Sequence, residues 1–186
     1  MTVESAMSAA TEKMDKAIAV LKDELSGVRT GRATPALLQR IVVDYYGTAV
    51  PIQQLASFSV PEPRTLMVTP FDPNAIAAME KAIMASDLGI TPGNDGTVIR
   101  LSFPPLTEER RKELVKLVHH RGEEARVAVR NIRRHSKEEL EKLEREGAIS
   151  EDDLVRSERE LQKVTDKHIS DVDEVVAHKD AELKEI

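Results

Sequence analysis

The chain has 186 residues with a formal net charge of −6, and 32% of its residues are charged. It contains no cysteine, which excludes disulfide bonds and thiolate metal sites. No stretch approaches the ~20 consecutive apolar residues of a membrane span, and Met1–Lys16 lacks the apolar segment of a secretory signal. We therefore expect a cytoplasmic protein that does not contact a membrane.

The first predicted helix runs from about residue 2 to residue 28. Its apolar residues recur every three or four positions, which is typical of a helix with one buried stripe. They are Met7, Ala10, Met14, Ala17, Leu21, Leu25 and Val28. Gly31 and Pro35 then break the helix, and Arg29 and Arg32 flank the break. This segment is a basic site at a helix end, a hinge, or a plain C-cap with Arg29 near the negative end of the helix dipole.

The segment from Pro35 to Pro105 predicts a small α+β unit of about 70 residues, near the lower limit for independent stability. Short runs rich in β-branched and aromatic residues predict strands, and Gly or Pro lies beside most of them. The predicted strands are 41–46, 49–52, 55–60, 65–69 and 97–103. Asp72 and Pro73 predict the start of a helix that ends before Gly89.

The longest predicted helix runs from Thr107, its expected N-cap, to about Arg145. A stripe of apolar or small residues with steps of three or four predicts its buried face. This stripe is Leu114, Val118, Gly122, Ala125, Val129, Ile132, Ser136, Leu140 and Leu143. A third helix is expected to follow Ser150, its predicted cap. Its predicted inner face is Leu154, Leu161, Val164, His168, Val172, Val175, Lys179 and Leu183.

The opposite face of the longest helix concentrates positive charge. It carries Arg126, Arg130, Arg133, Arg134 and Lys137, within about a third of the circumference at roughly 100° per residue. One interpretation is an ordinary solvated face. Two observations favour phosphate binding instead: no acidic residue lies between Arg126 and Lys137, which argues against pairing within the helix, and arginine, whose planar guanidinium suits phosphate, predominates. Arginine side chains that point inward, or that pair with carboxylates of the third helix, would contradict this interpretation.

Three long amphipathic helices are expected to bury one another's stripes as an elongated antiparallel three-helix bundle. We predict an α+β fold in which residues 1–30 and 106–186 form this bundle and residues 31–105 form an inserted small β/α/β domain. The two connecting segments contain Gly and Pro, which predicts a joint rather than a rigid fusion.

No pattern of a catalytic or metal site stands out in the sequence. The P-loop, the G-x-G-x-x-G loop and the H-E-x-x-H motif are absent. The histidines lack metal-ligand spacing with a carboxylate partner, so we interpret them as solvated or packed between helices. They are His119, His120, His135, His168 and His178. We expect no catalytic residue, no metal and no cofactor.

Several long blocks of the chain are similar to one known family. The blocks are Arg29–Ala33, Val43–Gly47, Pro51–Ala56, Glu80–Gly89, Asn94–Gly96, Pro105–Arg111 and Val127–Arg134. Together they resemble the bacterial ribosome recycling factors over essentially the full length of the chain, which is far more specific than one short motif. The resemblance implies an L-shaped protein of roughly tRNA size, with its bundle on the rRNA of the large ribosomal subunit. It also implies that elongation factor G with GTP acts on the bound complex and splits the post-termination ribosome, freeing it from mRNA and deacylated tRNA.

Carried onto this sequence, the resemblance makes Arg130, Arg133 and Arg134 the first candidates for contacts with rRNA phosphates. Further candidates for this surface are Arg126, Lys137, Arg111 and Arg32. The predicted hinge residues are Arg29, Thr30, Gly31, Pro35, Pro104 and Pro105. We expect a monomer whose partners are the large ribosomal subunit and elongation factor G, and which catalyses no covalent reaction itself.

The alternative function is a helical chaperone or adaptor protein without ribosome binding. Such a protein needs an exposed apolar groove, whereas three helices are expected to use all of the predicted stripes here. An enzyme would instead need a pocket with converging titratable groups.

Overall fold

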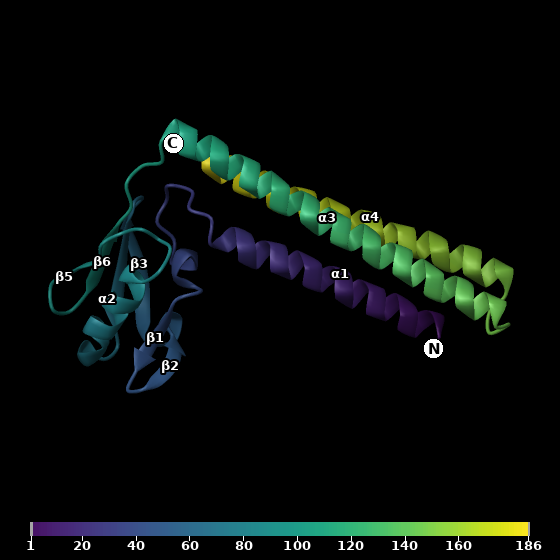
Figure 1. Cartoon of the computed structure of the whole chain (residues 1–186), viewed down its shortest axis with the longest axis horizontal. Coiled ribbons are helices and arrows are strands. Elements are labelled where there is room, and N and C mark those ends of the chain that lie inside the picture. The colour runs from purple at the N-terminus through teal and green to yellow at the C-terminus, as the bar shows by residue number, and fades with distance from the viewer. Residues whose placement is uncertain (1, 186) are drawn as a thin grey trace. The chain divides into compact units, whose positions relative to one another are not determined.

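The computed structural model describes residues 2–185, which fold into two compact units (Figure 1). The first unit comprises the chain up to Leu25 together with Glu113–Lys184, and the second comprises Ser26–Lys112 with Glu185. Both predicted connecting segments therefore fall in the second unit. No helix in the described range has the length and apolar character that crossing a membrane requires.

The first unit is a bundle of three helices, α1 (Val3–Ser26), α3 (Glu108–Arg145) and α4 (Glu151–Lys184). The three helices lie side by side, and α3 runs in the opposite direction to both neighbours (Figure 1). The predicted three-helix bundle is confirmed. Every residue of the predicted stripe on α3 is buried except Ile132, which is partly buried against the same core. Small side chains of α1, Ala6 and Ala10, contribute to that core and let the helices approach closely.

The inner face of α4 is more polar than predicted. Leu161, His168 and Val172 are buried as expected, but Ser157 and Thr165 are buried as well. Their hydroxyls donate to the carbonyl oxygens four residues earlier in the helix, at 2.7 Å and 2.8 Å. Because these bonds satisfy the hydroxyls inside α4, the two residues can lie in the core without a partner on another helix.

Both predicted caps of the long helices are confirmed. Thr107 Oγ1 accepts from the backbone N–H of Arg110 at 3.1 Å. Ser150 Oγ accepts from the N–H of Asp153 at 3.1 Å, and Asp153 Oδ2 accepts from the N–H of Ser150 at 3.3 Å. This reciprocal pair is a capping box with an aspartate in place of the usual glutamate. Hydrogen bonds from Ser150 lower the pKa of the Asp153 carboxyl, which keeps it ionised at the positive end of α4.

The second unit contains two antiparallel sheets. Strands β1 (Val42–Tyr45) and β2 (Thr48–Pro51) form a hairpin. The other sheet has the order β3-β4-β6-β5, with β3 at Ala56–Glu62, β4 at Thr65–Pro70, β6 at Ile99–Ser102 and β5 at Gly93–Asn94. The second unit also contains helix α2 (Ile76–Met84) and three short 3₁₀ turns. These turns are η1 (Pro35–Leu38), η2 (Ile52–Gln54) and η3 (Pro73–Ala75).

The core of the second unit lies between α2 and the strands. Met79 and Ile83 of α2 are buried in one cluster with Leu66, Ile99 and Leu101 of the four-stranded sheet. The α+β class and every predicted strand are confirmed, with shifts at the ends. Only the two-residue strand β5 was not predicted, because two residues carry no periodicity.

Gly122 sets how closely α3 and α4 can approach. A Cβ atom at this position would lie 2.5 Å from Cγ2 of Val176, well inside van der Waals contact. Val176 is itself buried and β-branched, so it has little freedom to move away. A glycine in the middle of a helix normally costs about 1 kcal/mol relative to alanine. Here close helix packing offsets that cost.

We predict that Gly122→Ala destabilises the protein despite its better helix propensity. Overpacking a well-filled core costs about 1–3 kcal/mol, and each kcal/mol lowers the melting temperature of a chain of this size by about 2–4 °C. Thermal unfolding followed by circular dichroism measures the change. Val176→Ala should relieve the clash, so the double variant should be more stable than the two single losses added together. A higher melting temperature for Gly122→Ala alone would contradict the close approach.

Candidate nucleic-acid interface

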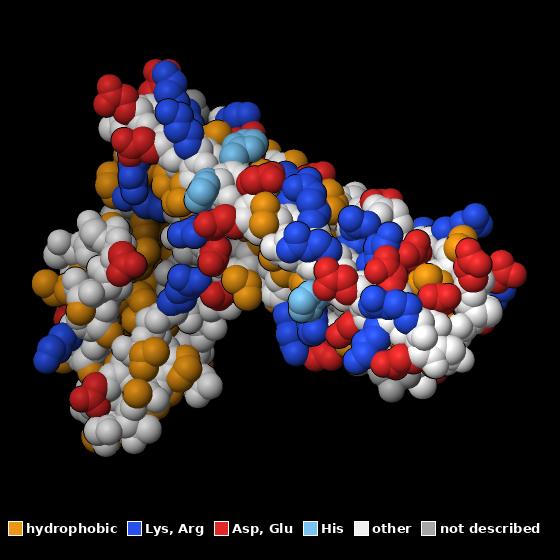
Figure 2. Space-filling model, turned by 45° about the vertical axis from the view of Figure 1, so that its right-hand side comes forward, with side chains coloured by type: hydrophobic (Ala, Val, Ile, Leu, Met, Phe, Trp, Pro, Cys, Tyr) orange, Lys and Arg blue, Asp and Glu red, His pale blue; other side chains and the backbone are white. Residues whose placement is uncertain are grey.

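Five cations define what we call the α3 basic face: Arg126, Arg130, Arg133, Arg134 and Lys137. They lie on one continuous helix, but not opposite its buried stripe as the sequence predicted, because Arg126, Arg133 and Lys137 each contact a side chain of α4 at the edge of that stripe. Figure 2 shows Lys and Arg side chains gathered over the bundle, with Asp and Glu side chains among them. The contacts of each cation therefore decide which positive charges remain available to a ligand.

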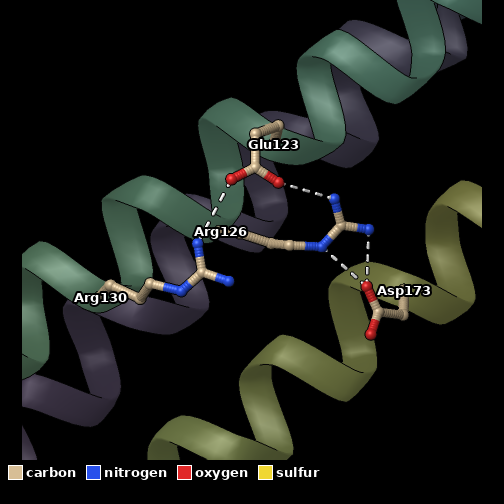
Figure 3. A network of polar contacts seen from close by, with 4 residues as sticks. All are labelled: Glu123, Arg126, Arg130 and Asp173. Atoms are coloured by element: carbon tan, nitrogen blue, oxygen red, sulfur yellow. Dashed lines mark hydrogen bonds and ion pairs between the residues drawn. The ribbon is translucent and has the colours of Figure 1, made fainter.

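Arg126 is engaged inside the bundle. Its Nε and Nη2 atoms both donate to Asp173 Oδ1 of α4, at 2.8 Å and 2.6 Å, and its Nη1 donates to Glu123 at 3.2 Å (Figure 3). Only 20% of its side chain is exposed. Burial alone lowers the pKa of its guanidinium, but the combined hydrogen bonds and charges of Asp173 and Glu123 raise it above the ordinary value. The expectation of a free guanidinium here is wrong, because a carboxylate of α4 occupies it.

Glu123 also pairs with Arg130, and it lies just before the run of cations. Its Oε1 accepts from Arg130 Nη1 at 3.3 Å, while Arg130 remains 54% exposed (Figure 3). The expectation that pairing within the helix cannot explain the face is therefore wrong for Arg126 and Arg130, and also for Lys137, which pairs with Glu141 of α3. That expectation considered only the interval from Arg126 to Lys137, whereas a helix also brings residues three and seven positions earlier onto the same side.

Arg133 and Arg134 keep their charge uncompensated. Arg133 Nη1 donates to the neutral amide oxygen of Gln162 at 3.3 Å, and Arg134 Nη2 lies 3.5 Å from Asn131 Oδ1. Neither of them pairs with a carboxylate in the described part of the chain. Lys137 differs, because it lies between Glu158 at 3.4 Å and Glu141 at 3.7 Å.

The two outlying candidates, Arg111 and Arg32, belong to the second unit. Arg111 is half-buried, and its Nε atom is buried without a hydrogen-bond partner among residues 2–185. Arg32 is exposed and pairs with Glu185 at 3.1 Å. Neither residue is part of the α3 basic face.

The predicted hinge segments are tied to each other. The Arg29 guanidinium donates to the carbonyl oxygen of Pro104 and lies 5.7 Å from the centre of the Phe103 ring. Burial lowers the pKa of this guanidinium. Thr30 is buried, and Gly31 adopts a φ of 86°, which a residue with a side chain rarely adopts. Arg29 therefore holds the two segments together rather than capping α1, which ends at Ser26.

The three prolines of these segments have different surroundings. Pro35 starts η1, where the Thr34 hydroxyl accepts from the N–H of Ala36 at 3.3 Å. Pro104 and Pro105 are both exposed, between the last strand and the first turn of α3. Their fixed backbone angles limit the conformations of the segment without adding a contact of their side chains to the core.

The histidines are solvated or packed between helices, as predicted. His168 is buried, with Nδ1 2.7 Å from the Val164 carbonyl oxygen and Nε2 2.9 Å from Asp15 Oδ1 of α1. His119, in contrast, is exposed and lies 3.6 Å from Asp180 of α4. Within residues 2–185, no three His, Asp or Glu side chains are grouped so that they could hold a metal ion.

The sequence analysis did not identify the residues of α4 that contact the α3 basic face. Asp173, Gln162 and Glu158 each contact one of its cations. Arg159 lines a depression between the two helices together with Arg133. No local signal identifies these residues, because Glu158 and Glu160 flank Arg159 and make the segment look like an ordinary mixed-charge face.

Comparison with known proteins gives a consistent result. Residues 21–183 match the family described as ribosome recycling factor. The chain is 54% identical over 175 residues to the ribosome-recycling factor of Saccharopolyspora erythraea, covering 94% of this chain and 95% of that protein. It is similar to a solution structure of the ribosome recycling factor, with a TM-score of 0.84 and 45% identity over 100% of this chain and 99% of that one.

A second similar structure is described as models for the T. thermophilus ribosome recycling factor and the E. coli elongation factor G bound to the E. coli post-termination complex. It has a TM-score of 0.72 and 47% identity, covering 98% of this chain and 99% of that one. The family match covers most of the chain. The Saccharopolyspora erythraea protein aligns with 94% of the chain at 54% identity. The chain therefore belongs to the ribosome recycling factor family.

Proposed function

We propose that this protein binds the large ribosomal subunit through the α3 basic face and, with elongation factor G and GTP, splits the post-termination ribosome. The split would release mRNA and deacylated tRNA and free the ribosome for a new round of initiation. Family membership supports the general role. The proposal for this chain extends to the rRNA contact, the partner factor and the order of events.

The observation that carries the proposal is the uncompensated charge at Arg133 and Arg134. Two guanidinium groups on one helix, without carboxylate partners in the part of the chain that the structure describes, suit the phosphate groups of an RNA backbone. Arg130 adds a partly compensated charge beside them, and Lys137 lies at the edge. Arg126 is left out of the proposed contact, because Asp173 already binds it.

The second unit has a separate role in this proposal. Its two connecting segments would act as a joint, so that elongation factor G can move the unit while the bundle stays on the ribosome. A similar structure, described as models of a ribosome recycling factor and elongation factor G bound to a post-termination complex, supports a shared site of action. GTP would be bound by the elongation factor, since this sequence has no P-loop. On this proposal the chain acts as a monomer in the cytoplasm and needs no cofactor or metal.

The function is tested by co-sedimentation with purified large subunits at graded salt, followed by a splitting assay on post-termination ribosomes. Binding should weaken linearly on a double-logarithmic plot against salt concentration, because each phosphate contact releases counterions. Splitting, measured by light scattering, should require this protein, elongation factor G and GTP together. Salt-independent binding, or splitting without this protein, would argue against the proposal.

We predict that Arg133→Gln and Arg126→Gln affect different measurements. Arg133→Gln should weaken binding to the large subunit by roughly three- to tenfold and lower the salt slope by about 0.7–1, with an unchanged melting temperature. Arg126→Gln should instead lower stability by about 1–2 kcal/mol, because it leaves Asp173 unpaired and removes a packed side chain. Glutamine keeps helix propensity in both variants. If Arg126→Gln weakened binding and Arg133→Gln lowered stability, the roles assigned to the two arginines would be wrong.

A second prediction concerns the joint. Short Gly-Ser insertions after Gly31 and after Pro104 should leave binding to the large subunit intact, since the bundle is unchanged. They should slow splitting, because displacement of the second unit is transmitted poorly through slack connections. The matched control is the same insertion in the exposed turn at Asp95–Gly96, which lies outside both segments. Full splitting activity with both connections lengthened would exclude a mechanical role for them.

A further inference from the structure

A depression of about 290 Å³ lies between α3 and α4. From α3, Arg133 and Lys137 line it, and from α4, Arg159 and Glu158 line it together with Val155, Leu161 and Gln162. Three cations and one carboxylate thus surround a hollow that is open to solvent. The sequence-based set of RNA-contact candidates contains only cations from α3 and from the segments before it.

The ion pairs between α3 and α4 are interrupted at this depression. On one side, Arg126 of α3 binds Asp173 of α4 at 2.6 Å. On the other side, Lys137 lies 3.4 Å from Glu158. At Arg133, between them, α4 presents the neutral Gln162 instead of a carboxylate.

Arg159 increases the positive charge of the same place. It is exposed and pairs with no carboxylate within the described residues. The single acid in the lining, Glu158, is already shared with Lys137. Two guanidinium groups therefore line one hollow, and neither pairs with a carboxylate among residues 2–185, so an anion bound there would reduce their mutual repulsion.

Gln162 makes the site more ordered than a pair of loose surface arginines. Its Oε1 accepts from Arg133 at 3.3 Å, while its Nε2 donates to Asp166 of the same helix at 2.8 Å. The amide is thus oriented by its own helix and holds the Arg133 guanidinium against α4. A ligand loses less conformational entropy of the protein at a site that is already held in place.

We propose that this depression binds one phosphate group, that of an RNA backbone, between Arg133 and Arg159, with Lys137 at its edge. The inference rests on the proposed function and extends it, because it adds α4 to the RNA-binding surface and assigns Arg159 to it. A phosphate group offers several acceptor oxygens, so two guanidinium groups from different helices can bind it at once. The RNA backbone would then cross the α3–α4 groove.

The test compares Arg159→Gln with Arg156→Gln in binding to purified large subunits at graded KCl. Arg156 is the matched control, because it lies on the same helix, is 76% exposed and pairs with Asp153 at 3.8 Å. Arg159→Gln should weaken binding by roughly three- to tenfold and lower the salt slope by about 0.7–1. Arg156→Gln should change affinity by less than about twofold. Thermal unfolding of both variants should match the original protein, since both side chains lie at the surface.

A double variant tests whether the two arginines share one phosphate. If they do, Arg133→Gln with Arg159→Gln should lose less affinity than the product of the two single losses, because the second change removes a contact already weakened. Losses that multiply fully would overturn the shared site. Equal affinity of Arg159→Gln and Arg156→Gln would overturn the inference itself.

The failure of the inference is distinguishable from failure of the proposed function. If Arg133→Gln weakens binding and Arg159→Gln does not, the proposed RNA binding by α3 is supported and the contribution of Arg159 on α4 is excluded. If the original protein shows no salt-dependent binding, the proposed function falls as well. A parallel arm measures melting temperature in inorganic phosphate against chloride at constant ionic strength. One outcome is that phosphate stabilises the original protein but neither Arg133→Gln nor Arg159→Gln, while the affinity of both variants for the large subunit is unchanged. That result would indicate a site for the free ion and would overturn an RNA contact.

Discussion

The burial of one stripe on α3 determines where every cation on that helix can point. Gly122 lets α4 approach to within contact of the α3 backbone, and Val129 and Leu140 are fully buried against their neighbours. With that side of α3 fixed, a residue's position along the helix decides whether it lies beside α4 or faces outward. The basic face is thus a consequence of core packing, because the same rotation that buries the stripe places each arginine either at the edge of α4 or toward solvent.

The position relative to α4 then separates structural cations from those available to a ligand. Arg126 lies beside α4, is largely buried and meets Asp173, so leaving it unpaired would be unfavourable. Arg133 also lies beside α4 but meets the neutral Gln162. Arg134 is exposed, and within residues 2–185 its guanidinium has only Asn131 of its own helix within hydrogen-bond distance. Three arginines that look alike in sequence therefore have three different environments, and only the last two can offer full charge to an anion.

The parts of the fold that could be predicted are those in which the information is local. The stripe of α3 follows from helical periodicity, and the caps at Thr107 and Ser150 follow from side-chain chemistry within three residues. The pairs that cross between helices could not be predicted, because they depend on the rotation of one helix against another. Arg126 and Asp173 are 47 residues apart, and His168 and Asp15 are 153 residues apart. The error at Glu123 was different, since this acid was visible in the sequence but lay outside the interval considered.

A negatively charged protein can use such a face only if its acidic residues do not cancel it. The chain carries a formal net charge of −6, so attraction to RNA cannot come from its total charge. At physiological ionic strength, exposed charges farther apart than about 8 Å are largely screened from each other, and a helix with its side chains is about 10 Å across. Acidic groups on the far side of the bundle therefore contribute little to the potential at Arg133 and Arg134. Two carboxylates on the same side of the bundle, Glu123 and Glu158, each already pair with a cation of α3. On the proposed function, acidic residues elsewhere on the bundle would disfavour other orientations on RNA, so charge placement would orient the bundle as well as attract it.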